Sequence, residues 1–314
     1  MPGKLPTEKE VLSYAKKLSN WGRWGTDDEL GTLNLITPAK RLQAHKLVKE
    51  GVTVSCGRLF ERGFAADTGQ PPLHFMKSSG ERWVGVKYQP GVAQSSGDSF
   101  MIDLHGTGLT HLDAIVHFFW EGMSYNNRPA NVVTTHMGAL KSGIQTMRNG
   151  IVSRGLLYDF CTYKKKAWLE PGEVLYVKDL EAIEKAEGIK AEPGDILLYR
   201  TGYYRMRKET GPLTLEEGRP GFHPEVLPWM RERGIAVCGG DGASDVFPGV
   251  FKAVPMPFHQ IGIPMMGLIL LDNANLEELG AACASRKRWE FCLTFAPLPI
   301  VNATSSPVNP IAEF

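Results

Sequence analysis

Short apolar runs typical of β-strands alternate with helical segments from Val52 onward, and this alternation limits the folds open to the chain. The strand-like runs are "VTVSCGRLF", "SFMIDLH", "GIVSRGLLYDF", "DILLYRTGYY", "GIAVCGG", "GLILLDN" and "WEFCLTFAPLPIV". Helical periodicity marks "LYVKDLEAIEKAEG", "HPEVLPWMRERG" and "NLEELGAACASR" between them. The pattern predicts one mixed α/β domain over residues 51–314, without giving the order of its strands.

The first fifty residues differ, because their signals are those of helices. In "PTEKEVLSYAKKLSNWG", Glu10 follows Thr7 by three residues, the spacing of a capping box. In "TPAKRLQAHKLVKEG", Pro38 falls in the first turn and Gly51 provides a stop. We expect residues 1–50 to form a helical N-terminal arm.

Composition excludes several classes of partner. The 314 residues carry 35 basic and 34 acidic side chains, so no charge excess favours nucleic acid or an anionic membrane surface. The five cysteines have no CxxC spacing, which indicates reduced thiols. The N-terminus is too charged for a signal peptide, and no apolar run approaches a membrane span. We expect a soluble, cytoplasmic protein that acts on a small molecule.

The stretch "LHGTGLTHLDAIVHFFWEG" (104–122) gathers three histidines and one aspartate. His105, Thr107, His111, Asp113 and His117 share one parity, so an extended chain would direct them to one face. Two interpretations are open: a metal-binding active site, or a buried segment that happens to be rich in histidine. Burying so many polar groups without a metal would leave several in need of partners, which favours the metal.

Spacing separates these side chains by role. His111 and Asp113 offer a nitrogen and an oxygen donor two residues apart, and both can reach one divalent ion at about 2.0–2.2 Å. A fully extended chain would hold His105 about 20 Å away from His111. Gly106 and Gly108 permit the chain to fold back, because glycine accepts positive φ. His105 is therefore a conditional ligand.

His117 lies four residues beyond Asp113 and is suited to a different task. A neutral imidazole close to the ion, without binding it, can accept a proton from water. The motifs of zinc proteases, nucleophile elbows and phosphate-binding loops are absent from the sequence. A metal-dependent hydrolase is the chemistry that these donors suit.

The sequence resembles the cyclase family of metal-dependent hydrolases, which includes kynurenine formamidases, isatin hydrolases and a trans-dienelactone hydrolase. The family's H-x-G-T-H-x-D-x-P-x-H stretch is similar to "THLDAIVH" here. Further similarity lies in "RWGTDDELGTLNLITP", "GIVSRGLLYD", "GDILLYRTGYY", "GGDGASD" and "ATSSPVNPIAEF". The resemblance implies a single mixed-sheet domain of the swivelling β/β/α type, preceded by the helical arm.

The resemblance also implies roles for individual residues. His111 and Asp113 would bind metal, and His117 would be the general acid/base. His259 and Asp272, from "FHQIGIPMMGLILLDNANLEEL", would complete a second metal position; on spacing alone they read as a helix or loop histidine and a turn residue.

Thr107 departs from the family pattern. It occupies the place of the family's first metal histidine, and His105 is the candidate replacement. The family's proline is Ile115 here.

The loop "GGDGASD" supplies further candidates, because catalytic loops often follow an apolar strand. Asp241, Ser244 and Asp245 are candidates to orient the metal ligands. Asp245 has an alternative role as a turn cap.

Three more residues are candidates for the substrate pocket. His74 is a possible pocket residue or extra ligand, with a surface loop as the alternative. Trp24 and Trp83 are candidates to pack on a flat substrate, with core packing as the alternative.

These observations together predict a hydrolase of a small formamide, cyclic amide or lactone. The expected cofactor is one or two divalent ions, zinc or manganese, and the family suggests a homodimer. The alternative from a different class is a non-catalytic small-molecule-binding protein on the same scaffold, with Thr107 marking a degraded metal site.

Overall fold

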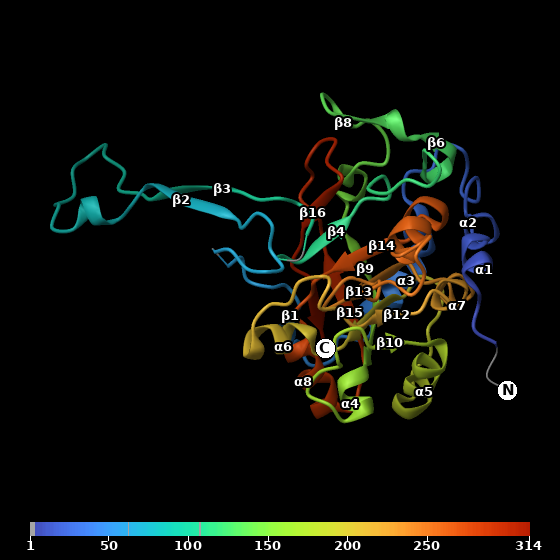
Figure 1. The fold of residues 1–314 in the computed structure, drawn as a ribbon. Helices are drawn as coiled ribbons and strands as arrows, with labels where there is room; N and C mark the ends of the chain where they lie inside the picture. The colour runs from blue at the N-terminus through green and yellow to red at the C-terminus, as the bar shows by residue number, and fades with distance from the viewer. Residues whose placement is uncertain (1–3, 62, 107) are drawn as a thin grey trace.

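A nine-stranded mixed sheet organises the computed structural model, which describes residues 4–61, 63–106 and 108–314 (Figure 1). Its strands run in the order β1-β17-β15-β9-β11-β13-β14-β4-β16. The central four are parallel to one another, and the outer strands join antiparallel. The bounds are β1 Thr53–Ser55, β4 His111–Asp113, β9 Ile151–Asp159, β11 Ile196–Arg200, β13 Val237–Gly240, β14 Ile269–Asp272, β15 Glu290–Phe295, β16 Ser305–Pro307 and β17 Ile311–Glu313.

Helices cover the parallel part of the sheet, as expected for strands that are apolar on both faces. Ile196, Leu197 and Leu198 on β11 are completely buried. The prediction of a mixed α/β domain is confirmed. The covering helices and their neighbours are α4 Phe160–Lys164, α5 Val177–Glu187, α6 Tyr203–Thr210, α7 Val226–Arg233, the π-helix η6 Phe258–Met266 and α8 Glu277–Arg286. Within the described residues, no helix combines the length and apolar character needed to cross a bilayer.

The N-terminal residues form short helices that pack on this domain: α1 Glu8–Leu12, α2 Tyr14–Lys17, η1 Gly31–Leu35 and α3 Pro38–His45. The predicted capping box of Thr7 and Glu10 is present. The Asn20 amide donates to the Met266 carbonyl at 2.8 Å, and the Trp21 indole donates to the Pro264 carbonyl at 2.7 Å. The arm is therefore attached to η6.

A long hairpin extends from the body of the molecule, on the side away from α1 and α2 (Figure 1). It consists of β2 Leu73–Ser78 and β3 Gly97–Met101, joined by a segment that contains the short helix η2 Glu81–Trp83. The remaining short elements are β5 Met123–Ser124, η3 Tyr125–Asn127, β6 Arg128–Pro129, η4 Ala130–Val132, β7 Val133–Thr134, β8 Gly138–Ala139, η5 Ile144–Met147, β10 Val174–Leu175 and β12 Gly221–Phe222.

A buried ion network fixes α3 against the sheet. The Asp195 carboxylate is completely buried and contacts Lys40 Nζ at 2.5 Å and Arg154 Nη2 at 2.6 Å. Lys40 belongs to α3, and Arg154 belongs to β9. The buried Asp195 carboxylate thus lies against two buried cations from separate elements, and its loss would leave the partly exposed Glu192 as the acid that contacts both.

We predict that Asp195→Asn lowers the free energy of unfolding by about 3 kcal/mol, because Lys40 and Arg154 lose the one completely buried carboxylate that they contact. Urea denaturation measures the change. Glu192→Gln is the matched control, since the Glu192 carboxylate contacts the same cations but is 52% exposed. Glu192→Gln should lower the free energy of unfolding by no more than about 1 kcal/mol. Equal effects of the two substitutions would contradict this account of the network.

Candidate metal centre

Strand pairing brings three potential ligands together at one end of the sheet. On β4, His111 and Asp113 lie two residues apart, so they project to the same side. The antiparallel pairing of β4 with β14 sets Asp272 directly opposite His111. The three side chains are between 2% and 5% exposed. The His111 Nδ1 lies 3.1 Å from the Leu109 carbonyl, an arrangement that leaves Nε2 on the side of the Asp113 carboxylate, 3.6 Å from Oδ1.

His259 reaches the same place from η6. Its Nε2 lies 3.4 Å from Asp272 Oδ2 and 3.8 Å from Asp113 Oδ2. Its Nδ1 lies 2.6 Å from Asp245 Oδ2, and Asp245 also accepts the Phe258 backbone N–H at 2.8 Å. A carboxylate on the far nitrogen of an imidazole fixes the ring and makes the near nitrogen a better ligand. Asp245 therefore orients His259.

His105 joins the group because the chain folds back before β4. Its Nδ1 lies 3.1 Å from Asp113 Oδ1, and its Nε2 contacts Thr304 Oγ1 at 2.9 Å. Gly106 has a φ of +109°, a conformation that side chains disfavour, and its carbonyl accepts the Asn273 amide at 2.9 Å. The distance expected for an extended chain therefore does not apply. Thr107, the departure from the family pattern, lies outside the described residues.

The donor atoms form two overlapping groups that share Asp113. His105, His111 and Asp113 make one, and Asp113, His259 and Asp272 make the other, with the ligand atoms of each group within 4.8 Å of one another. Both Asp113 oxygens, Asp272 Oδ1 and His105 Nδ1 are buried without a well-formed hydrogen bond. Buried polar atoms normally have partners, so these residues fit a divalent cation.

The charges of the site point the same way. Burial acts to raise the pKa of Asp113, yet His117, His105 and His111 together hold it below its ordinary value. Burial disfavours the charged form of His259, but Asp245 and Asp272 raise its pKa well above the usual range. The centre thus places carboxylates among imidazoles, a set of groups that attracts cations.

His117 lies beside the donors. Its ring stacks on that of His105 with centroids 3.5 Å apart and an interplanar angle of 12°, and it meets Phe118 edge to face. Burial lowers the pKa of His117 to about 4, against the opposing effect of Asp113. The imidazole is therefore neutral near pH 7 and has a nitrogen lone pair that can accept a proton.

A pocket of about 180 Å³ opens onto these residues. Several of its lining residues were missed by the sequence reasoning, because no motif marks them. They are Asn273, next to Asp272 in the chain, the apolar Leu215, Ala243, Phe247 and Met256, and the buried Arg219. Phe118, from the histidine-rich stretch, lines the pocket as well.

The other candidate residues lie elsewhere. Asp241 accepts the Thr201 and Tyr203 backbone N–H groups, so its carboxylate joins β13 to the start of α6. Ser244 Oγ lies 3.6 Å from Cys238 Sγ. Trp24 stacks under Arg23. His74 and Trp83 belong to the projecting hairpin, where His74 contacts Asp98. None of these residues lines the pocket of the donor groups.

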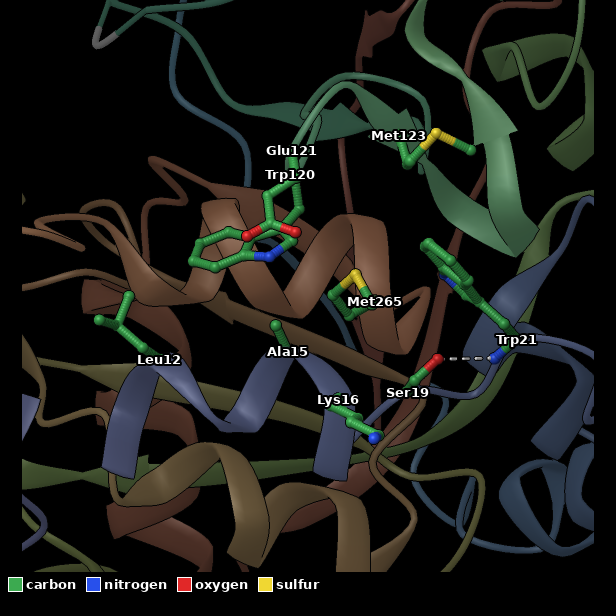
Figure 2. A pocket seen from close by; sticks show the side chains of 9 residues that line it. All are labelled: Leu12, Ala15, Lys16, Ser19, Trp21, Trp120, Glu121, Met123 and Met265. Carbon is green, nitrogen blue, oxygen red and sulfur yellow. Dashed lines mark hydrogen bonds between the residues drawn. The ribbon is translucent and has the colours of Figure 1, made fainter. Parts of the chain in front are cut away.

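A larger pocket, of about 570 Å³, lies between the N-terminal helices and η6 (Figure 2). Trp21, Trp120, Met123 and Met265 surround it, with Lys16 and Glu121 as its charged residues. Its lining contains no histidine and no cysteine. It therefore lacks the donors that would make it a metal centre.

We predict that Asp113→Asn removes stoichiometric binding of Zn²⁺ or Mn²⁺, because Asp113 belongs to both donor groups. Metal-stripped protein would be titrated by calorimetry, and the metal content after dialysis would be measured by mass spectrometry. His136→Ala is the control, since His136 is exposed and belongs to neither donor group. Unchanged affinity in the Asp113 variant would show that the donor groups do not bind the ion.

Comparisons with known proteins identify relatives of this chain in sequence and in structure. The sequence model of the Cyclase family, described as "Putative cyclase", matches residues 63–244. No curated protein matches. A crystal structure described as a novel cyclase is 29% identical, with a TM-score of 0.84 over 95% of this chain and 100% of that one.

Isatin hydrolases share the fold at lower identity. Isatin hydrolase A from Ralstonia solanacearum is 20% identical, with a TM-score of 0.59 over 88% of this chain and 97% of its own. An isatin hydrolase bound to the product analogue thioisatinate is 18% identical, with a TM-score of 0.56 over 87% and 94%. Because the family model covers more than half of its residues, the chain belongs to the cyclase family.

Proposed function

We propose that the protein is a divalent-metal-dependent hydrolase of a small carbonyl compound: a formamide, a cyclic amide or a lactone. The observation that carries this proposal is the pair of buried donor groups that share Asp113 in one pocket, with the His117 ring stacked beside them on His105. Membership of the cyclase family supports it, as does the shared fold with isatin hydrolases.

The ligands would be His105, His111, Asp113, His259 and Asp272. Their mixture of nitrogen and carboxylate oxygen suits zinc or manganese, as one ion or two. Such an ion, when bound, supplies Lewis acidity, which polarises a carbonyl and makes water more acidic. Asp245 holds the His259 ring in position, and the Leu109 carbonyl does the same for His111.

His117 would move the proton. As water attacks the carbonyl carbon, a C–O bond forms and an imidazole nitrogen of His117 accepts one proton. The C–N bond of the amide, or the C–O bond of the lactone, then breaks. The His117 proton passes to the leaving nitrogen or oxygen. A formamide then gives formic acid and an amine, whereas a cyclic amide or lactone opens to one molecule that carries both the acid and the amine or alcohol. Stacking on His105 restricts the motion of the His117 ring during both transfers.

We predict that metal-stripped protein hydrolyses none of a panel of aryl formamides, cyclic amides and lactones, and that Zn²⁺ or Mn²⁺ restores hydrolysis of at least one class. In the restored enzyme, His117→Ala should lower kcat by about 100-fold or more with the bound metal unchanged. Product release followed by chromatography measures both effects.

His45→Ala is the matched control for the His117 variant, because His45 is an exposed residue at the end of α3. No hydrolysis of any class in metal-loaded wild type would refute the proposed function. Full activity in the His117 variant would remove only the role of this residue as the acid/base.

We also propose that the chain forms a homodimer through the projecting hairpin. Large apolar side chains of the hairpin are exposed: Phe75 by 57%, Tyr88 by 78% and Phe100 by 58%. An isolated hairpin has marginal stability in water and gains most from a partner surface. A second copy is the partner that the family resemblance implies.

Light scattering on the purified protein tests the dimer. Wild type should have twice the mass of the chain, and the double variant Phe75→Lys, Tyr88→Lys should have the mass of one chain. Val301→Lys is the control, since Val301 is 75% exposed and lies outside the hairpin. A monomeric wild type, or a dimeric double variant, would contradict the assignment.

A further inference from the structure

Arg219 is an unusual component of the pocket wall. Its side chain is 1% exposed, and it lines the same pocket as the histidine and aspartate donors. Among the described lining residues it is the single lysine or arginine. Arginine is rarely this buried without an ionic partner, because removing a guanidinium from water is costly.

Two donor nitrogens of Arg219 are buried without a partner among the described residues. Neither Nε nor Nη2 makes a hydrogen bond, and no ion pair joins Arg219 to a described carboxylate. The guanidinium carbon lies 5.1 Å from the centre of the Tyr203 ring, a contact that does not satisfy N–H donors. The hydroxyl of Tyr203 is also buried without a partner.

Two carboxylates near Arg219, those of Asp67 and Asp241, accept hydrogen bonds from other groups. Asp67 receives two hydrogen bonds from Arg207, at 2.7 and 2.9 Å. Asp241 accepts the backbone N–H groups of Thr201 and Tyr203. Burial lowers the pKa of Arg58 to about 10, and the positive charges of Arg207 and Arg219 act in the same direction. The guanidinium groups of Arg58 and Arg207 thus add positive charge near Arg219.

Backbone pairing holds Arg219 rigidly next to the metal centre. Arg219 and Phe247 exchange hydrogen bonds at 2.8 and 3.0 Å. The same loop bonds again at Phe222, whose N–H donates to the Ser244 carbonyl at 3.0 Å. Asp245, which orients His259, lies between these two contacts. The segment that positions a metal ligand thus also positions the arginine.

We propose that Arg219 binds a carboxylate of the substrate, so that the enzyme acts on small carbonyl compounds that also carry a free carboxylate. This inference rests on the proposed function for the hydrolysis itself, but the anion site is a property of the apoprotein. Arginine recognises a planar carboxylate through two parallel N–H donors, the type of donor left unused here. Its role is in binding and specificity, and it takes no part in proton transfer.

The apolar residues that line the pocket suit the part of the substrate between its carboxylate and its hydrolysable carbonyl. Phe118, Leu215, Phe247 and Met256 provide apolar surface in the pocket that also contains Arg219 and the donor groups. A ligand with a carboxylate, a short apolar skeleton and a hydrolysable carbonyl matches these three parts. An aryl or unsaturated skeleton suits the aromatic rings best.

Binding to metal-stripped protein tests the anion site without hydrolysis. Benzoate and its neutral analogue benzamide would be titrated by calorimetry into wild type, Arg219→Met and Arg219→Lys. We expect wild type to favour benzoate, and Arg219→Met to lose about 100-fold in benzoate affinity with little change for benzamide. Arg219→Lys should retain part of the preference. Arg205→Gln, which removes a half-exposed arginine paired with Glu209, is the matched control.

Thermal unfolding of the same proteins gives a second readout. A buried arginine without a protein partner can be replaced by methionine with no loss of stability or with a gain. Arg219→Met should therefore melt at or above the wild-type temperature, and benzoate should raise the melting temperature of wild type and of Arg205→Gln but not that of Arg219→Met. A large loss of stability in the variant would assign Arg219 a structural role and overturn the proposal.

Turnover separates this inference from the proposed function. An aryl formamide with a ring carboxylate would be compared with its neutral carboxamide counterpart. Arg219→Met should raise KM for the acid and leave kinetics of the neutral compound nearly unchanged. Equal losses on both compounds would overturn the anion site and leave the hydrolase proposal standing. Arg219-dependent benzoate binding with no hydrolysis of any compound would refute the hydrolase and keep the anion site.

Discussion

The pairing of β4 with β14 is the interaction on which the candidate centre depends. It sets Asp272 opposite His111 and leaves Asp113 two residues along the same strand. Antiparallel partners hold their side chains about 5 Å apart, so ligand atoms from distant parts of the chain are brought within coordinating range. A shift of the register by one residue would turn the donors to the other face of the sheet.

The remaining parts of the centre are attached to this pair by hydrogen bonds from other segments. Asp245 fixes His259 from the loop after β13, and Thr304 contacts His105 from the segment before β16. Asn273 holds the Gly106 carbonyl, and so supports the bend that returns His105 to β4. Three segments that are distant in sequence thus hold His259 and His105 against the strand pair that carries His111, Asp113 and Asp272. The same arrangement leaves Arg219 buried in the pocket without an ionic partner.

Much of the fold could be predicted from residues in sequence. The apolar runs that predict strands correspond to β9, β11, β13, β14 and β15, and Thr7 forms the predicted capping box. The helices could also be predicted, because hydrophobic periodicity and helix caps are local properties of the sequence. The shared parity of the five odd-numbered positions was less informative about which side chains meet. The strand β4 contains only His111 to Asp113, and His105 and His117 lie outside it. Their approach to the donors comes from turns.

The sequence by itself determined which donor side chains the chain offers, histidines and aspartates at spacings that suit a metal, and the pattern that resembles the cyclase family. The tertiary structure decided which acid orients His259, since Asp241 and Asp245 are equivalent candidates in the sequence. Asp241 serves the backbone of α6, and Asp245 contacts the imidazole. It also decided the place of Arg219, which no motif marks. The physical reason is that a buried charge is defined by what surrounds it, and those neighbours come from segments far apart in the chain.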